Sequence, residues 1–273
     1  MKKIFFILSD IFIGAYLVMA MTSWNGITSL TRCNKVTIQI ADENSNGFLT
    51  KQEIQRLLKK HDIYPLGQPL TIANPRMIEE ELKRMPFVKK AQCSISQDGH
   101  ATIIVTQRTP LVRIKNAYNQ DYYIDDNGGI MPNSQYISNL MIATGNISKQ
   151  YATQYISVIA RYLMEDELWS KEIEQINVTP DLHVELVPRN AEHVVNIGRM
   201  PKINKSLSPS KRNEELNNYL KHQLSRLELF YRYVPQTLND AVPKDTANNL
   251  NEIYNYINLE YNNQIICQRR TSL

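Results

Sequence analysis

The sequence has few of the residues from which nucleotide, zinc and disulfide sites are built. Only nine of its 273 residues are glycine, and no glycine-rich phosphate loop is present. Its three cysteines, Cys33, Cys93 and Cys267, are widely spaced and odd in number. This pattern argues against a paired-cysteine zinc site and against a disulfide scaffold. We therefore expect packed hydrophobic cores to supply the stability.

Patterns of known catalytic sites are also missing, since the chain has no G-x-S-x-G or H-E-x-x-H motif. His183 and His193 are placed to face each other across a hairpin centred on Pro188, but without a third ligand we interpret them as structural rather than as a metal pair. Cys93 and Cys267 alternate with isoleucines and are interpreted as buried thiols. We expect no enzyme activity, no cofactor, no metal and no small-molecule substrate.

Positive charge is not concentrated in any one region. The net charge is +4, and the basic clusters are single pairs such as Lys59-Lys60 and Lys89-Lys90. Nucleic-acid-binding proteins place such charge in stripes with interleaved aromatic residues, so nucleic acid is not an expected partner. The length is sufficient for a membrane anchor and about two domains.

An apolar segment runs from Ile4 to Trp24. At about 1.5 Å per residue, a helix of this length spans roughly 30 Å, the thickness of the hydrocarbon core of a bilayer. Lys2 and Lys3 precede it and favour a cytoplasmic N-terminus. Asp10 divides the segment, so a cleaved signal peptide is the alternative, but no A-x-A cleavage site follows. Both interpretations export the rest of the chain.

The next region predicts a small α+β domain. Alternation of apolar and polar residues indicates strands, a T-x-x-E capping box and an Asn-Pro pair each begin a helix, and an Asp-Gly pair marks a hairpin turn. The predicted order is strand, helix, helix, strand, strand. The strands are expected at 35–41, 87–96 and 101–107, and the helices after Thr50 and Asn74.

One motif in this domain matches the calcium loop of an EF-hand: Asp42, Asn44, Asn46, Gly47 and Glu53 have the spacing D-x-[DN]-x-[DN]-G-x5-E. A true EF-hand has a helix before the loop, whereas an alternating strand precedes it here. Glu53 also belongs to the capping box, and Asp, Asn and Gly are ordinary turn residues. A plain turn is favoured over a calcium site.

The remainder predicts a strand-rich domain with two amphipathic helices. One helix begins at Ser148, and the other carries leucines at i, i+4 spacing between Leu216 and Phe230. The strands from 173 to 197 are expected to form a meander, and a loop is expected at 235–247. The predicted strands lie at 111–114, 122–124, 130–131, 173–178, 182–187, 193–197, 254–259 and 264–268.

Five phrases in order resemble the FtsQ/DivIB family of bacterial cell-division proteins. They are Leu82–Ala91, the turn Arg108-Thr109-Pro110, the hairpin Tyr123–Gly128, the strand end Met141–Gly145 and the closing Tyr256–Tyr261. Together with the N-terminal apolar segment, they extend over almost the whole chain.

Four residues differ from the usual family pattern. They are Phe87, Gln107, Asn258 and Glu260. These differences bear on individual contacts more than on the fold.

The resemblance implies an α+β fold with a POTRA domain (β-α-α-β-β) after a single uncleaved transmembrane helix, followed by an FtsQ-type β domain. The implied organisation is a cytoplasmic tail at 1–3, a transmembrane helix at 4–24, a linker at 25–34, the POTRA domain at 35–107, the β domain at 108–270 and a tail at 271–273. The implied location is the inner membrane, with the N-terminus cytoplasmic and most of the chain periplasmic.

The resemblance also implies a non-catalytic divisome scaffold that recruits other single-pass division proteins at the septum. The family's C-terminal region binds the FtsB/FtsL pair, which carries over here to Tyr261, Asn263 and Gln264. The last strand has no successor, so we expect its free edge to accept a partner strand. The alternative is an exported calcium- or ligand-binding module that uses residues 42–53.

Overall fold

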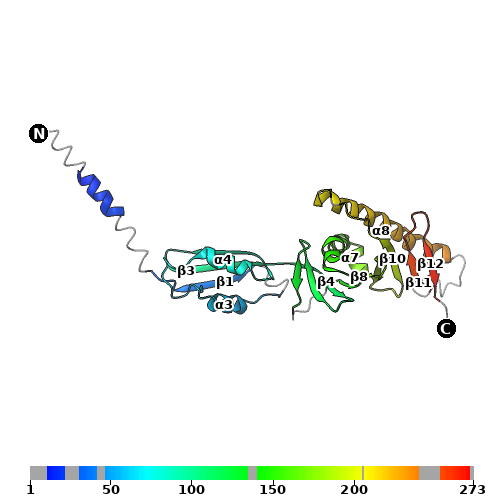
Figure 1. The fold of residues 1–273 in the computed structure, drawn as a ribbon, viewed down its shortest axis with the longest axis horizontal. Coiled ribbons are helices and arrows are strands. Elements are labelled where there is room, and N and C mark those ends of the chain that lie inside the picture. The colour runs from blue at the N-terminus through cyan, green and yellow to red at the C-terminus, as the bar shows by residue number, and fades with distance from the viewer. Residues whose placement is uncertain are drawn as a thin grey trace. The chain divides into compact units, whose positions relative to one another are not determined.

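The computed structural model describes residues 11–21, 31–41, 47–134, 140–204, 206–239 and 253–270. They form two compact units, Met1–Arg108 and Thr109–Leu273. Each unit combines helices with a β-sheet (Figure 1), so the predicted α+β class is confirmed.

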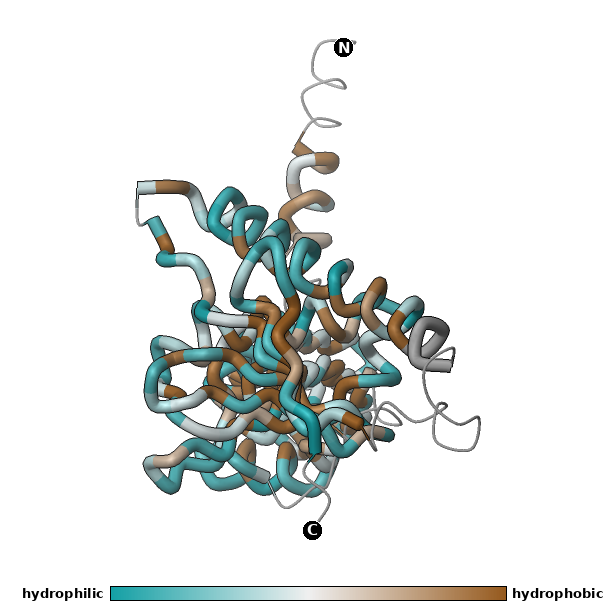
Figure 2. The backbone as a smooth tube through the Cα atoms, turned by 90° about the vertical axis from the view of Figure 1, so that its right-hand side faces the viewer, coloured by the Kyte–Doolittle hydropathy of each residue, from teal (hydrophilic) through white to brown (hydrophobic). Residues whose placement is uncertain are grey.

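Residues 11–21 are helical and mostly hydrophobic (Figure 2). No helix within the described ranges has both the length and the apolar character needed to cross a bilayer. The expected span, 4–24, extends at both ends into residues that the structure does not describe. The transmembrane helix therefore stays a prediction.

The first unit has the predicted order of elements. Its three strands form a sheet in the order β1-β3-β2, in which β1 is parallel to β3 and β2 is antiparallel to it. The two helices bury Ile54, Leu58, Ile78 and Leu82 against this sheet. The elements are β1 (Lys35–Ile40), α3 (Lys51–Lys60), α4 (Pro75–Lys83), β2 (Val88–Ile95) and β3 (His100–Gln107).

Both helices of this unit begin at the predicted caps. The Thr50 hydroxyl accepts the Glu53 N–H at 3.2 Å, and the Glu53 carboxylate accepts the Thr50 N–H at 2.8 Å. The Asn74 side chain accepts the N–H groups of Arg76 and Met77. Each cap satisfies backbone donors that a helix N-terminus otherwise leaves unpaired, which fixes where the chain turns into α3 and α4.

The second unit is built on a nine-stranded sheet with the order β12-β11-β10-β9-β8-β7-β4-β5-β6. The strands are β4 (Pro110–Asn116), β5 (Asp121–Asp125), β6 (Ile130–Pro132), β7 (Ile142–Gly145), β8 (Ile173–Val178), β9 (His183–Pro188), β10 (Val194–Arg199), β11 (Tyr254–Asn258) and β12 (Ile266–Arg269). The helices are α5 (Lys149–Tyr151), the π-helix η1 (Ala152–Ile156), α6 (Ser157–Glu165), α7 (Trp169–Glu172) and α8 (Pro209–Asn239).

The core of this unit lies between the sheet and the helices. Along α8, hydrophobic and hydrophilic residues alternate (Figure 2), as in a helix with one buried face. Leu220 and Leu224 on α8 are buried together with Val195 and Ile257 on the neighbouring strands β10 and β11. Polar residues such as Asn177 alternate with these apolar ones along the strands, because successive side chains point to opposite faces of a sheet.

The sequence-based description of the second unit is right in its elements and incomplete in their connections. The predicted meander is confirmed, since β8, β9 and β10 pair antiparallel in chain order. The parallel pairs β4·β7, β7·β8 and β10·β11 have no local sequence signal. The loop predicted from Pro235 is wrong at its start, because α8 continues to Asn239. The apolar face of α8 still packs on the core at Val234, and such packing opposes the lost N–H donor and the ring clash that a proline brings to a helix.

Truncation of Leu220 tests the packing of α8 on the sheet. Leu220→Ala leaves a cavity at a fully buried position and is expected to lower the free energy of unfolding by about 2–5 kcal/mol. Asn218→Ala, at an exposed position on the same helix, is the control and should change it by no more than about 0.5 kcal/mol. Chemical denaturation followed by circular dichroism measures both, and equal effects would contradict this packing.

Candidate partner-binding edge

The strand β12 forms one edge of the nine-stranded sheet. It pairs with β11 on one side, and no strand in the described part of the chain pairs with its other side. Three of its four residues, Ile266, Gln268 and Arg269, are exposed. The edge is therefore accessible both at its backbone and at its side chains.

The direction of the β12 amides follows from one hydrogen bond. Arg270 donates its N–H to the carbonyl of Ile253 at 2.9 Å, toward β11. Because amides alternate in direction along a strand, the N–H groups of Gln268 and Ile266 also point toward β11. Those of Arg269 and Cys267 point away from it, where another strand can accept them.

The turn between β11 and β12 brings together the three residues implied by the family resemblance. Tyr261, Asn263 and Gln264 are all exposed, and Tyr261 has 49% of its surface accessible. Gln264 donates its N–H to the Tyr261 carbonyl at 3.4 Å. An exposed aromatic ring at a tight turn, directly before a free strand edge, is a suitable anchor for a protein partner.

Arg226 on α8 holds this turn in place. Its guanidinium donates to the carbonyls of Leu259 at 2.8 Å, Tyr261 at 2.6 Å and Gln264 at 2.8 Å, and to the side-chain oxygen of Gln223 at 2.8 Å. Burial lowers the pKa of Arg226 from its ordinary value. The turn is thus fixed by a charged group that donates to three backbone carbonyls, and such bonds are stronger than neutral ones.

Arg226 belongs to no motif in the sequence. Its signal is its position: with Gln223, Leu227 and Phe230 it follows the i, i+3, i+4, i+7 spacing of the buried stripe of α8. An arginine in an apolar stripe indicates a specific hydrogen-bond acceptor. The backbone carbonyls that accept from Arg226 lie 33 to 38 residues away in the sequence. Only the fold identifies them.

A bulge in β10, between Asn196 and Gly198, lies against the residues that lead into the same turn. Gly198 has φ +85°, and a Cβ there would lie 2.9 Å from the Tyr219 hydroxyl and 3.4 Å from the Glu260 Cα. That hydroxyl donates to the Ile197 carbonyl at 2.5 Å. The positive φ and this close approach both require glycine, so the end of β11 can pack directly on β10 and α8.

Within the described residues, His183 and His193 lie apart from each other. His183 lies 3.0 Å from the Glu260 carboxylate, and His193 lies 2.7 Å from the Tyr231 hydroxyl. The expectation that these histidines face each other is wrong, because the register pairs His183 with Arg199. Each ring instead has its own partner. No group of three or more potential metal ligands gathers within the described ranges.

The cysteines behave as partly buried thiols. Burial raises the pKa of Cys93 to about 11 and also raises the pKa of Cys267. Both side chains pack against hydrophobic cores, and Cys33 is 1% exposed. A thiol with a raised pKa stays protonated near neutral pH and is a poor nucleophile, as the sequence analysis expects.

The EF-hand-like motif is only partly within the described residues. Asp42, Asn44 and Asn46 lie outside them. Glu53 lies inside, and its carboxylate accepts both the N–H and the hydroxyl of Thr50 at 2.8 Å. Its role in the capping box is confirmed, and that role directs the carboxylate to the helix N-terminus.

Comparison with protein families identifies both units. A POTRA-like domain model matches residues 31–106, and a model described as FtsQ/DivIB, C-terminal related, matches residues 109–212. These two matches, in this order along the chain, support the resemblance to the FtsQ/DivIB family. No curated protein matches it. The FtsQ/DivIB match ends in the first turns of α8, so Arg226, β11 and β12 lie beyond the matched residues.

Two of the phrases that resemble the FtsQ/DivIB family have clear structural roles. In the first unit, Arg108 donates its side chain to the Pro86 carbonyl at 2.9 Å and its N–H to the Phe87 carbonyl at 2.8 Å, which fixes the end of β3. In the second, Asp125 accepts the N–H groups of Asn127 and Gly129. The Asp125 carboxylate is therefore occupied in forming the turn.

Removal of the Arg226 guanidinium tests its role in the turn. Arg226→Gln is expected to speed amide exchange at Leu259 and Gln264 by about tenfold or more, because charge-assisted bonds to three carbonyls are lost. Arg232→Gln is the control, since Arg232 is exposed on the same helix and pairs only with Glu228 among the interactions found. Hydrogen exchange followed by mass spectrometry measures both variants. Unchanged exchange in Arg226→Gln would show that other contacts hold the turn.

Proposed function

We propose that this protein is a non-catalytic divisome scaffold, anchored in the inner membrane, that recruits FtsB/FtsL-type single-pass proteins through its exported units. The two family matches support a cell-division scaffold role. In this proposal the partner adds a strand to β12 and contacts the turn residues Tyr261, Asn263 and Gln264. Main-chain hydrogen bonds then supply affinity, and the neighbouring side chains supply specificity.

The observation that carries the proposal is the edge of β12, which no described strand pairs with, beside an exposed turn that Arg226 holds in place. The outward N–H groups of Cys267 and Arg269 are separated by one residue, which is the spacing of donors on a strand edge. Arg226 already orders the turn in the free protein. Binding of a partner therefore loses little conformational entropy from this turn.

The other end of the same sheet is less suited to strand addition. There the edge strand β6 has three residues, of which the last is Pro132. Proline has no N–H to donate, and short edge strands with proline are a common way to prevent pairing with another chain. This contrast favours β12 as the binding edge.

Membrane anchoring by the segment 4–24 adds to this proposal. A single-pass partner is confined to the same membrane, so tethering raises the effective concentration of the two binding segments for each other. The bulk of the chain is then periplasmic, where it meets the exported segments of its partners.

Proline at the outer amide of β12 tests strand addition. Arg269→Pro removes an N–H that points away from β11, whereas Arg269→Ala removes the same side chain and keeps that N–H. We expect Arg269→Pro to weaken capture of an FtsB/FtsL-type exported segment by about tenfold or more, and Arg269→Ala to have a much smaller effect. A pull-down with purified protein measures capture. Equal capture by the two variants would contradict strand addition at this edge.

Truncation of Tyr261 tests the aromatic anchor separately. Tyr261→Ala removes an exposed ring while the Arg226 bonds to the backbone carbonyls remain, so the fold should be preserved and capture of the same segment reduced by about tenfold. Circular dichroism confirms the fold. Tyr118→Ala is a matched control, because Tyr118 is exposed elsewhere on the same unit. Unchanged capture by Tyr261→Ala would exclude Tyr261 from the interface.

A further inference from the structure

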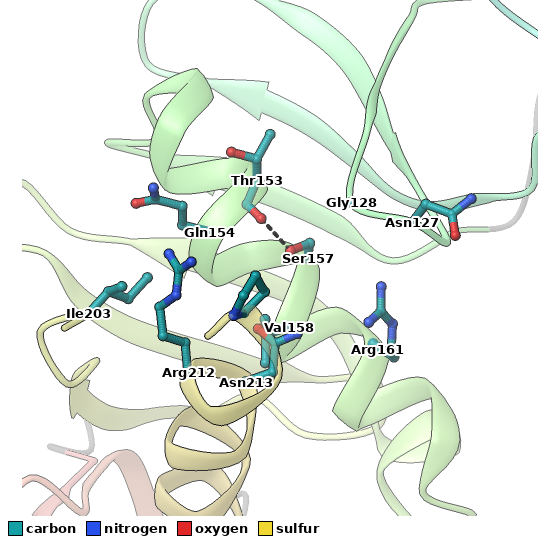
Figure 3. A pocket seen from close by; sticks show the side chains of 11 residues that line it. Asn127, Gly128, Thr153, Gln154, Ser157, Val158, Arg161, Ile203, Arg212 and Asn213 are labelled. Atoms are coloured by element: carbon teal, nitrogen blue, oxygen red, sulfur yellow. Dashed lines mark hydrogen bonds between the residues drawn. The ribbon is translucent and has the colours of Figure 1, made fainter. Parts of the chain in front are cut away.

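A second site candidate lies away from β12, in a cavity of about 200 Å³ within the same unit. It is bounded by η1 and α6, by the turn between β5 and β6 and by the first residues of α8 (Figure 3). On this measure a single water molecule needs only about 10–15 Å³. The cavity therefore has room for a small ion together with some water.

The lining of this cavity is part polar and part apolar, and its charged side chains are all positive. Its two ionisable side chains are Arg161 from α6 and Arg212 from α8, and no acidic side chain lines it. Asn127, Gln154 and Asn213 add side-chain amides. With two cations and no acidic side chain among its lining residues, the cavity attracts an anion and repels a cation.

The two arginine side chains differ in their hydrogen-bond partners. Arg161 donates one N–H to the Asp126 carbonyl at 2.6 Å, which directs its guanidinium toward the Asn127-Gly128 turn (Figure 3). Arg212 extends from α8 toward η1 (Figure 3), and its Nε is buried with no hydrogen-bond partner in the described part of the chain. A buried donor without a partner is costly, and an anion in the cavity would satisfy it.

One further feature favours an anion in this place, and another limits which groups can bind it. The cavity lies at the N-terminus of the 31-residue helix α8, where the helix dipole attracts negative charge. The Ser157 hydroxyl already donates its proton to the Thr153 carbonyl at 2.6 Å. Charge recognition in the cavity therefore depends on the two arginines.

We infer that this cavity binds a phosphate group, with Arg161 and Arg212 as its charged donors. The planar fork of arginine matches the oxygens of phosphate, which it binds through two parallel hydrogen bonds. Two fixed positive charges also suit the double charge of phosphate better than the single charge of a carboxylate. The site is separate from the β12 edge and does not depend on the proposed scaffold function.

Calorimetric titration of the full-length protein in detergent tests this inference. Inorganic phosphate, glycerol phosphate and acetate are compared at constant ionic strength, so that free phosphate, a phosphate ester of the lipid-headgroup type and a carboxylate are distinguished. Saturable heat with either phosphate compound and a much weaker response to acetate is the expected result. Saturable heat with acetate alone, or with none of the three, would overturn the inference.

Variants locate the binding site. Arg212→Gln and Arg161→Gln should each weaken phosphate binding by about tenfold or more, because each removes a charged donor. Arg232→Gln, an equal change of charge on an exposed face of α8, should leave it unchanged. Thermal unfolding of each variant establishes that it is folded. Equal weakening by Arg232→Gln, or full binding by the folded double variant Arg161→Gln/Arg212→Gln, would contradict the site.

Discussion

The burial of the apolar face of α8 against the sheet is the constraint on which the C-terminal part of the structure depends. Each fully buried leucine contributes about 1.5–3 kcal/mol, and Leu216, Leu220, Leu224 and Leu227 share this face. Since β10 and β11 are parallel, a crossover must connect them, and α8 lies within that connection. Its packing sets the position of Arg226, which in turn fixes the β11–β12 turn.

The sheet edges show how the same fold protects some strands and leaves another open. In the first unit, the outer N–H of Cys93 on β2 donates to the Glu79 carboxylate at 2.9 Å, and this bond is the main cause of the lowered pKa of Glu79. A side chain of α4 thus occupies a donor that a foreign strand would need. The short β6 ends in proline. On β12, the outward donors at Cys267 and Arg269 have no such device among the described residues, which is why we assign partner binding there.

Local signals in the sequence predicted most of the elements, and they failed where distant segments meet. The Thr50–Glu53 box and the Asn74-Pro75 pair fixed two helix starts because a cap depends on residues within one turn. The alternation of 173–197 predicted three strands for the same reason. The sequence could not show that β7 lies between β4 and β8, that His183 meets Glu260, or that Arg226 meets the β11–β12 turn, because each depends on the register of elements far apart in the chain.

Local sequence patterns also do not identify the exposed residues of the candidate edge. Tyr261 is recognisable only through the family resemblance. The proposed function requires the backbone of β12 to accept a partner strand. Residue-resolved amide exchange with and without an FtsB/FtsL-type exported segment tests it most directly. The account predicts new protection of the Cys267 and Arg269 amides, with little change at Gln268, which already points toward β11. Protection confined to other strands, with Cys267 and Arg269 exchanging as in the free protein, would contradict it.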